Sequence, residues 1–131
     1  MEICTFGEHL TIDGYGGEYV FLNDRDVVEH YLIELPTLLD MHPLISPMVK
    51  WAESNDLKDS GGWSGYVLIA ESHISIHTFP HRRFLSADVY TCRNGTDTDL
   101  VIRYFTEKFG LADTETCFIK RGTKYPIRNI V

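Results

Sequence analysis

Two neighbouring segments decide the fold of this chain: His73-Ile74-Ser75-Ile76-His77-Thr78-Phe79 and Phe84-Leu85-Ser86-Ala87-Asp88-Val89-Tyr90-Thr91-Cys92. In both, aliphatic residues alternate with polar or aromatic ones. This is typical of strands, because successive strand side chains point to opposite faces of a sheet. A hairpin that turns near residues 81–82 pairs Ile74 with Val89 and His77 with Ser86, which places the aliphatic residues of both strands on one core. The predicted sheet therefore has one aliphatic face and one face of Ser, His, Asp, Tyr and Cys.

The same register has a chemical consequence at the end of the hairpin. It brings Cys92 opposite Glu71, beside the peptide bond that joins Glu71 to Ser72. Matching the two aliphatic faces is enough to predict that a thiol lies next to this bond.

Further strands and two helices are predicted outward from this hairpin. We expect strands over residues 3–13, 47–52, 63–71 and 114–120, with a polar loop over 53–62. We expect one helix from an Asn23 N-cap to about Pro36, and a second that begins at Asp97 or Thr98. So few helices most simply cover one face of an antiparallel sheet. The prediction is a single α+β domain over residues 1–131, a two-layer sandwich.

Composition excludes several classes of partner. The chain has 131 residues and a formal net charge of -7 without a lysine or arginine cluster, which argues against nucleic acid and anionic membranes. Its three cysteines, Cys4, Cys92 and Cys117, form no CxxC pair and favour a reducing compartment. The first residues lack the pattern of a signal peptide, and the longest apolar run, 66–70, is too short to cross a bilayer. We therefore expect a cytoplasmic protein.

Reactive side chains gather around the Glu71–Ser72 bond. A serine hydroxyl beside a peptide carbonyl can attack it and move the acyl group from nitrogen to oxygen, given local strain and a proton acceptor. The ester can then lose its acyl half by β-elimination, and hydrolysis releases ammonia and leaves a pyruvoyl group. His77 suits the proton transfers because imidazole titrates near neutral pH, and Ser64 can offer a hydroxyl to the developing charge. Each residue alone also fits a plain structural role, and it is their coincidence around one bond that indicates function.

Two other kinds of site fit the sequence less well. His73, His77 and His81 are spaced four residues apart, but on a strand this spacing is roughly 13 Å at about 3.3 Å per residue, so one zinc ion cannot bind two of them. We expect no metal site. A hydrolase built on Cys92 and His77 would need a third residue to orient the histidine, and none is evident.

These motifs resemble the prokaryotic S-adenosylmethionine decarboxylase proenzyme family. The similar stretches are residues 7–13, 62–65, 70–80 and 88–92. The Glu-Ser-His motif at residues 71–73, with a histidine and a cysteine at these offsets, is highly specific to that family.

The resemblance implies autocatalytic cleavage between Glu71 and Ser72, into a β chain of residues 1–71 and an α chain of residues 72–131. The α chain would begin with a pyruvoyl cofactor made from Ser72, which forms a Schiff base with the substrate amine and accepts the electrons that decarboxylation leaves. By the same resemblance His77 and Ser64 are processing residues and Cys92 is the proton donor. It further implies a homodimer, and a product used in spermidine biosynthesis.

Two departures from the family pattern bear on the substrate. His81 stands where the family usually has a glutamate, and the family's Phe-His-aromatic segment ahead of the glycine-serine turn is not recognisable. Phe79, which could stack on adenine, and Asp13 are the candidate substrate-binding residues. A pyruvoyl-dependent arginine or ornithine decarboxylase on the same fold is the main alternative function. A second is an unprocessed, non-catalytic binding partner of an active enzyme.

Overall fold

The main sheet has six strands, all antiparallel, in the order β3-β4-β5-β6-β2-β7. The structure is a computed structural model, and it describes residues 1–55 and 57–131. The strands of this sheet are β2 (Gly7–Tyr15), β3 (Met48–Ala52), β4 (Gly62–Ile69), β5 (Ser72–Phe79), β6 (Phe84–Thr91) and β7 (Asp113–Arg121).

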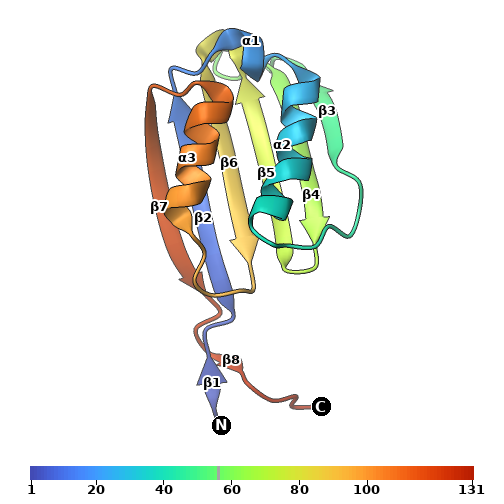
Figure 1. Cartoon of the computed structure of the whole chain (residues 1–131), viewed down its shortest axis with the longest axis vertical. Coiled ribbons are helices and arrows are strands. Elements are labelled where there is room, and N and C mark those ends of the chain that lie inside the picture. The colour runs from blue at the N-terminus through green and yellow to red at the C-terminus, as the bar shows by residue number, and fades with distance from the viewer. Residues whose placement is uncertain (56) are drawn as a thin grey trace.

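The helices cover one face of this sheet. Figure 1 shows α2 (Arg25–Leu38) and α3 (Thr98–Phe109) side by side in front of the strands, with the short α1 (Tyr19–Leu22) near one end. In the part of the chain that the structure describes, no helix covers the opposite face, which we call the open face. The predicted two-layer α+β sandwich is confirmed.

The predicted hairpin register is confirmed. In β5 and β6, Ile74 pairs with Val89 and His77 with Ser86, and a turn of 3₁₀ helix over Pro80–Arg82 connects the strands. Ile74 and Val89 are at most 1% exposed, because their face of the sheet packs against the helices. The alternating pattern thus fixes which face carries the core and which carries the polar side chains.

Local capping explains where the helices begin. The Asp24 carboxylate accepts hydrogen bonds from the backbone N–H groups of Asp26 and Val27, so Asp24 and not Asn23 is the N-cap of α2. The Asp97 carboxylate accepts from Leu100 N–H at the start of α3, as the sequence indicates.

Five details of the sequence prediction need correction. The strand expected over residues 3–13 is two strands, β1 (Ile3–Cys4) and β2. Helix α1 and strand β8 (Tyr125–Pro126) were not expected, and Pro36 lies inside α2, in its last turn, where the helix continues to Leu38. The loop expected over 53–62 contains residue 56, which lies outside the described residues, and its last position, Gly62, already belongs to β4.

The two ends of the chain form a small ribbon apart from the main sheet. Strand β1 pairs with β8 in a two-stranded sheet, which projects beyond the sandwich in Figure 1. Among the described residues, no helix is long and apolar enough to cross a membrane.

Candidate active site

Backbone strain falls on Ser72, at the hairpin between β4 and β5. Ile69 pairs with Ser72, so the connection consists of Ala70 and Glu71 alone. Two-residue hairpins are best closed by turns with positive φ at their central residues, which glycine and asparagine adopt easily. Neither Ala70 nor Glu71 has a positive φ, and it is Ser72 that takes the unusual conformation, with φ of 146°. Such backbone conformations cost a non-glycine residue on the order of 1–3 kcal/mol.

The carbonyl next to Ser72 is held by a backbone donor. Cys92 N–H donates a 2.7 Å hydrogen bond to the Glu71 carbonyl oxygen, as expected from the register that places Cys92 opposite Glu71. A donor at this oxygen stabilises the negative charge that develops there when a nucleophile attacks the carbonyl carbon. The Cys92 side chain is half-buried and its thiol is free.

The Glu71 side chain is held as well. Its carboxylate accepts a hydrogen bond of 3.0 Å from His42 N–H and lies 2.8 Å from His42 Nδ1. Burial disfavours the charged carboxylate, but the hydrogen bonds from His42 outweigh burial and hold the pKa of Glu71 below its usual value. Glu71 is therefore ionised at neutral pH and fixed by His42, a residue that the sequence analysis did not single out.

Ser64 and His77 form a second centre at the other end of β5. They are directly paired across β4 and β5, and Ser64 Oγ lies 2.8 Å from His77 Nδ1. Gly65, the next residue, faces α2 on the opposite side of the sheet, where a Cβ would lie only 2.9 Å from Leu32 Cδ1. His77 follows Ser72 by five residues on a continuous strand, a separation of roughly 16 Å at about 3.3 Å per residue. One chain therefore does not bring Ser64 and His77 to the Glu71–Ser72 bond.

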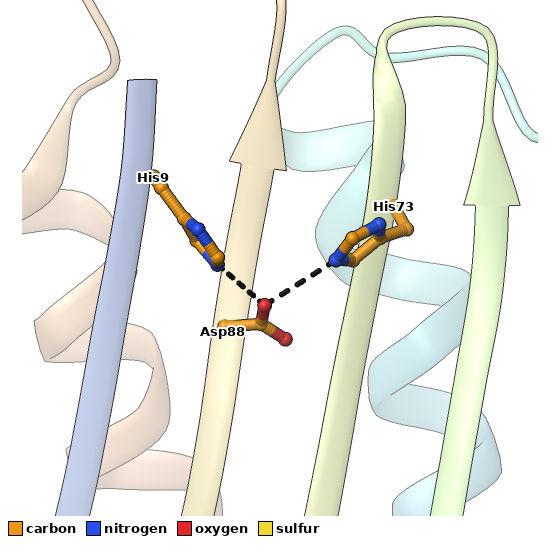
Figure 2. A group of neighbouring side chains, drawn as sticks. All are labelled: His9, His73 and Asp88. Carbon is orange, nitrogen blue, oxygen red and sulfur yellow. Dashed lines mark hydrogen bonds and ion pairs between the residues drawn. The ribbon is translucent and has the colours of Figure 1, made fainter. Parts of the chain in front are cut away.

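Between the two ends, the open face carries a polar cluster that spans three adjacent strands (Figure 2). His9 from β2 and His73 from β5 both point to Asp88 on β6, with Nε2–Oδ2 distances of 2.6 and 3.3 Å. Ser75 Oγ donates to the other carboxylate oxygen of Asp88. Asp88 thereby fixes the ring of His73, the residue that follows Ser72.

The polar cluster has the residue types of a metal site, but its hydrogen bonds oppose one. Arg121 Nη1 lies 3.1 Å from His9 Nδ1, and a guanidinium can only donate, so Nδ1 is the acceptor. The hydrogen of a neutral His9 ring is then on Nε2, the atom that faces Asp88, and this atom has no lone pair for a metal ion. This arrangement favours a hydrogen-bonded cluster over a metal centre. From its spacing in the sequence, His73 is weighed as a metal ligand only with His77 and His81, and not with His9 and Asp88.

The two candidate substrate-binding residues lie toward the His77 end of the sheet. Asp13 on β2 pairs with Ser86, the residue that also pairs with His77. The half-buried Phe79 lines a cavity of about 470 Å³ whose other lining residues are Asn55, Lys58, Asp59, Arg82 and Phe84. That volume lies in the usual range for small-molecule sites. His81 is exposed and packs against the Tyr19 ring.

The comparisons with known proteins agree on one family. The family model described as S-adenosylmethionine decarboxylase matches residues 8–122. The S-adenosylmethionine decarboxylase proenzyme 2 of Bacillus anthracis is 35% identical over 104 residues, which cover 79% of each chain. The S-adenosylmethionine decarboxylase proenzyme of Thermococcus gammatolerans is 31% identical over 121 residues, which cover 92% of this chain and 80% of the relative.

A solved structure has the same fold. The crystal structure of the adenosylmethionine decarboxylase from Aquifex aeolicus VF5 superposes with a TM-score of 0.79 and covers 96% of this chain and 98% of its own. Its sequence identity is 24%, so this likeness supports the architecture, and the sequence relatives carry the family assignment.

Proposed function

Because the chain belongs to the S-adenosylmethionine decarboxylase family, we propose that it is a proenzyme that cleaves itself between Glu71 and Ser72 and then decarboxylates S-adenosylmethionine. The observation that carries this proposal is the state of that one peptide bond. Ser72 is strained at φ of 146°, and the Glu71 carbonyl already accepts a hydrogen bond from Cys92 N–H.

Cleavage follows from the chemistry of these groups. Ser72 Oγ attacks the Glu71 carbonyl carbon, and the acyl group moves from the Ser72 nitrogen to its oxygen. Cys92 N–H stabilises the oxyanion that forms, and the strain at Ser72 is released as the peptide bond breaks. A base then removes the Ser72 α-proton, the bond between Cβ and Oγ of residue 72 breaks, and Glu71 leaves with a new main-chain carboxylate at its C-terminus. Hydrolysis of the resulting dehydroalanine releases ammonia and yields the pyruvoyl group.

The residues at this end of the sheet fit such a group. When formed, a pyruvoyl group supplies an electrophilic carbonyl and an electron sink for decarboxylation. Cys92, whose backbone N–H donates to the Glu71 carbonyl, is the residue that we propose gives its thiol proton to the product carbon. Asp13 and Phe79 lie at the opposite, His77 end of the sheet, so we propose that they contact the substrate from a second copy of the chain.

We further propose that two copies of the chain combine into a homodimer, because each copy holds the reactive bond and the processing pair at opposite ends of β5. The open faces of two copies can meet across a twofold axis that lies parallel to the sheets and perpendicular to the strands. The strands of the second copy are then antiparallel to those of the first. Ser64 and His77 of one copy then approach Ser72 of the other, where His77 can take the α-proton.

Apolar side chains on the open face support this contact. Met48, Tyr66, Leu68 and Ile119 belong to this face by their strand pairing and are 40–43% exposed. A second sheet packed against this face would remove their apolar surface from water, which favours association. The proposed homodimer acts on a small-molecule substrate, and we propose that it does so in the cytoplasm, as its relation to the S-adenosylmethionine decarboxylases suggests.

Intact mass spectrometry tests the proposed function. The purified protein should give two fragments, residues 1–71 and a downstream fragment lighter than its serine-started form by one ammonia. Ser72→Ala should remain one intact chain, since it lacks the attacking hydroxyl. Release of labelled carbon dioxide from S-adenosylmethionine, but not from arginine or ornithine, should accompany cleavage. A single intact wild-type chain in a preparation with full decarboxylase activity would overturn the proposal.

A further inference from the structure

We infer that His42 is a positioning residue for self-cleavage, which holds the Glu71 half of the reactive bond in place so that strain stays on Ser72. This inference rests on the proposed function. His42 lies outside the motifs that relate the chain to its family, and its contacts with Glu71 are the basis of this inference.

His42 holds Glu71 through two separate donors. Its backbone N–H and its ring Nδ1 lie 3.0 and 2.8 Å from the two carboxylate oxygens of Glu71. Two contacts to one carboxylate restrict its rotation as well as its position. The Glu71 side chain is only 12% exposed, whereas the His42 side chain is 71% exposed, so His42 reaches in from the surface.

The segment that carries His42 is itself attached to the hairpin. Ala70 N–H donates 2.8 Å to the His42 carbonyl, and Leu44 N–H donates 2.8 Å to the Leu68 carbonyl. These bonds extend the pairing of β4 beyond the part that β3 covers. The Glu71 turn is therefore bordered by His42 on one side and by Cys92 on the other.

Arg93 connects the segment that carries Cys92 to the segment that carries His42. Its guanidinium donates to the backbone carbonyls of Leu39 and Asp40, just ahead of His42. Since Arg93 follows Cys92 in the chain, the donor at the Glu71 carbonyl and the segment that holds the Glu71 carboxylate are tied to each other. The acyl half of the bond is thus fixed at both its carbonyl and its side chain.

This attachment matters because strain promotes a reaction only where it cannot relax in another way. If Glu71 were free to move, the two-residue turn could adjust its own backbone angles and return Ser72 to an ordinary conformation without breaking a bond. With Glu71 held at three points, relaxation by moving Glu71 is opposed, and cleavage remains the way to release the strain. The same contacts hold the position of the attacked carbonyl relative to Ser72.

A time course of cleavage in newly translated full-length chains tests this role. His42→Ala should slow cleavage about tenfold, as expected for loss of a hydrogen bond to a charged group at a largely exposed residue. His42→Asn should recover most of the rate, because the asparagine amide nitrogen is as many bonds from the backbone as Nδ1 and also donates. His30→Ala, which removes an exposed histidine on α2, is the matched control and should cleave at the normal rate.

Two further measurements separate positioning from a general effect on folding. In an uncleavable Ser72→Ala background, His42→Ala should still unfold in one cooperative transition, with a urea midpoint lowered only by the loss of one hydrogen bond to a carboxylate. In a Glu71→Gln background, removing the His42 ring should slow cleavage less than it does in the wild type, because the two residues act as one unit. If the wild type cleaves and His42→Ala cleaves equally fast, or if His42→Asn is as slow as His42→Ala, the inference is overturned. If the wild type does not cleave at all, it is the proposed function that fails.

Discussion

The two ends of β5 hold different halves of one chemistry. At its start, Ser72 has a strained backbone, and the carbonyl beside it already has a hydrogen-bond donor, but the histidine there, His73, is oriented toward Asp88. At the other end, His77 is hydrogen-bonded to Ser64 and faces water. In the proposed mechanism, the first end holds the bond that breaks and the second end holds the base, which is too far away to act on that bond within one chain.

In the proposed homodimer, this difference would let the chain fold before it reacts. A single copy that brought base and strained bond together would risk cleavage while the sheet was still forming. With a separation of roughly 16 Å at about 3.3 Å per residue, the proposed reaction depends on a second, folded copy. The open face, with its polar side chains and exposed apolar residues, is both the dimer contact and the reaction site in this proposal.

The largest expected effect separates two functions of Cys92. Cys92→Ala keeps the backbone N–H that holds the Glu71 carbonyl, so cleavage should proceed at a similar rate. Loss of the thiol should lower decarboxylation by about 10²–10⁴-fold, the usual contribution of a general acid. Cleavage is measured on gels and turnover by carbon dioxide release from the same preparation. Normal turnover in this variant would remove Cys92 from the mechanism.

A second prediction compares acidic residues of β2 at the two ends. Glu8 on β2 pairs with Thr91 on β6, which in turn pairs with Ser72. Glu8 is 2% exposed and forms a 2.6 Å ion pair with Lys120. Asp13, at the His77 end of β2, is partly exposed. Burial alone would raise the pKa of Glu8, but hydrogen bonds from Lys120 and from Thr96 N–H outweigh it and lower that pKa. The ion pair therefore stabilises the fold above the ordinary carboxyl pKa, and this stabilisation is lost as the pH falls through the lower folded-state pKa.

Lys120→Met should accordingly reduce the free energy of unfolding by about 1–2 kcal/mol at pH 7, since it leaves a buried carboxylate with one donor fewer. The difference from the wild type should shrink under acidic conditions, where Glu8 is protonated in both proteins. Lys50→Met, on β3 near Ser64, is the control and should have little effect. Urea titrations at both pH values measure this, and a difference independent of pH would contradict the role given to Glu8.

The smallest effect concerns the strain itself. Ser72→Gly and Ser72→Ala both lack the attacking hydroxyl, so neither should cleave. Glycine adopts φ of 146° without a steric cost, and alanine does not, so the glycine variant should be more stable by about 1 kcal/mol despite its greater freedom in the unfolded chain. Equal stabilities by thermal unfolding would mean that the backbone at Ser72 stores little energy.

The sequence was most informative where one physical constraint acted alone. Alternation over residues 73–79 and 84–92 was enough to predict the register and the contact between Cys92 and Glu71, because a shift by one residue would expose every aliphatic side chain. Helix ends were less predictable, since Asn23 and Asp24 are both good N-caps and only the backbone geometry decides between them.

What could not be read from the sequence depended on long-range geometry. His42 reaches Glu71 because the chain after α2 runs along β4, and no local pattern indicates this path. The cluster of His9, His73 and Asp88 combines three strands that become neighbours only in the folded sheet. The distance between Ser72 and His77 follows directly from strand geometry, yet motif spacing alone suggested that they act at one point within a chain.

The most direct test of the two-copy account uses two inactive chains with different tags. One carries Ser72→Ala and keeps His77, and the other carries His77→Ala and keeps Ser72, so neither should cleave when produced alone. When the two are produced together and the mixed dimer is isolated through both tags, the His77→Ala chain should be cut after Glu71, while the Ser72→Ala chain stays intact. An isolated mixed dimer in which both chains remain whole would contradict the account, as would efficient cleavage of the His77→Ala chain on its own.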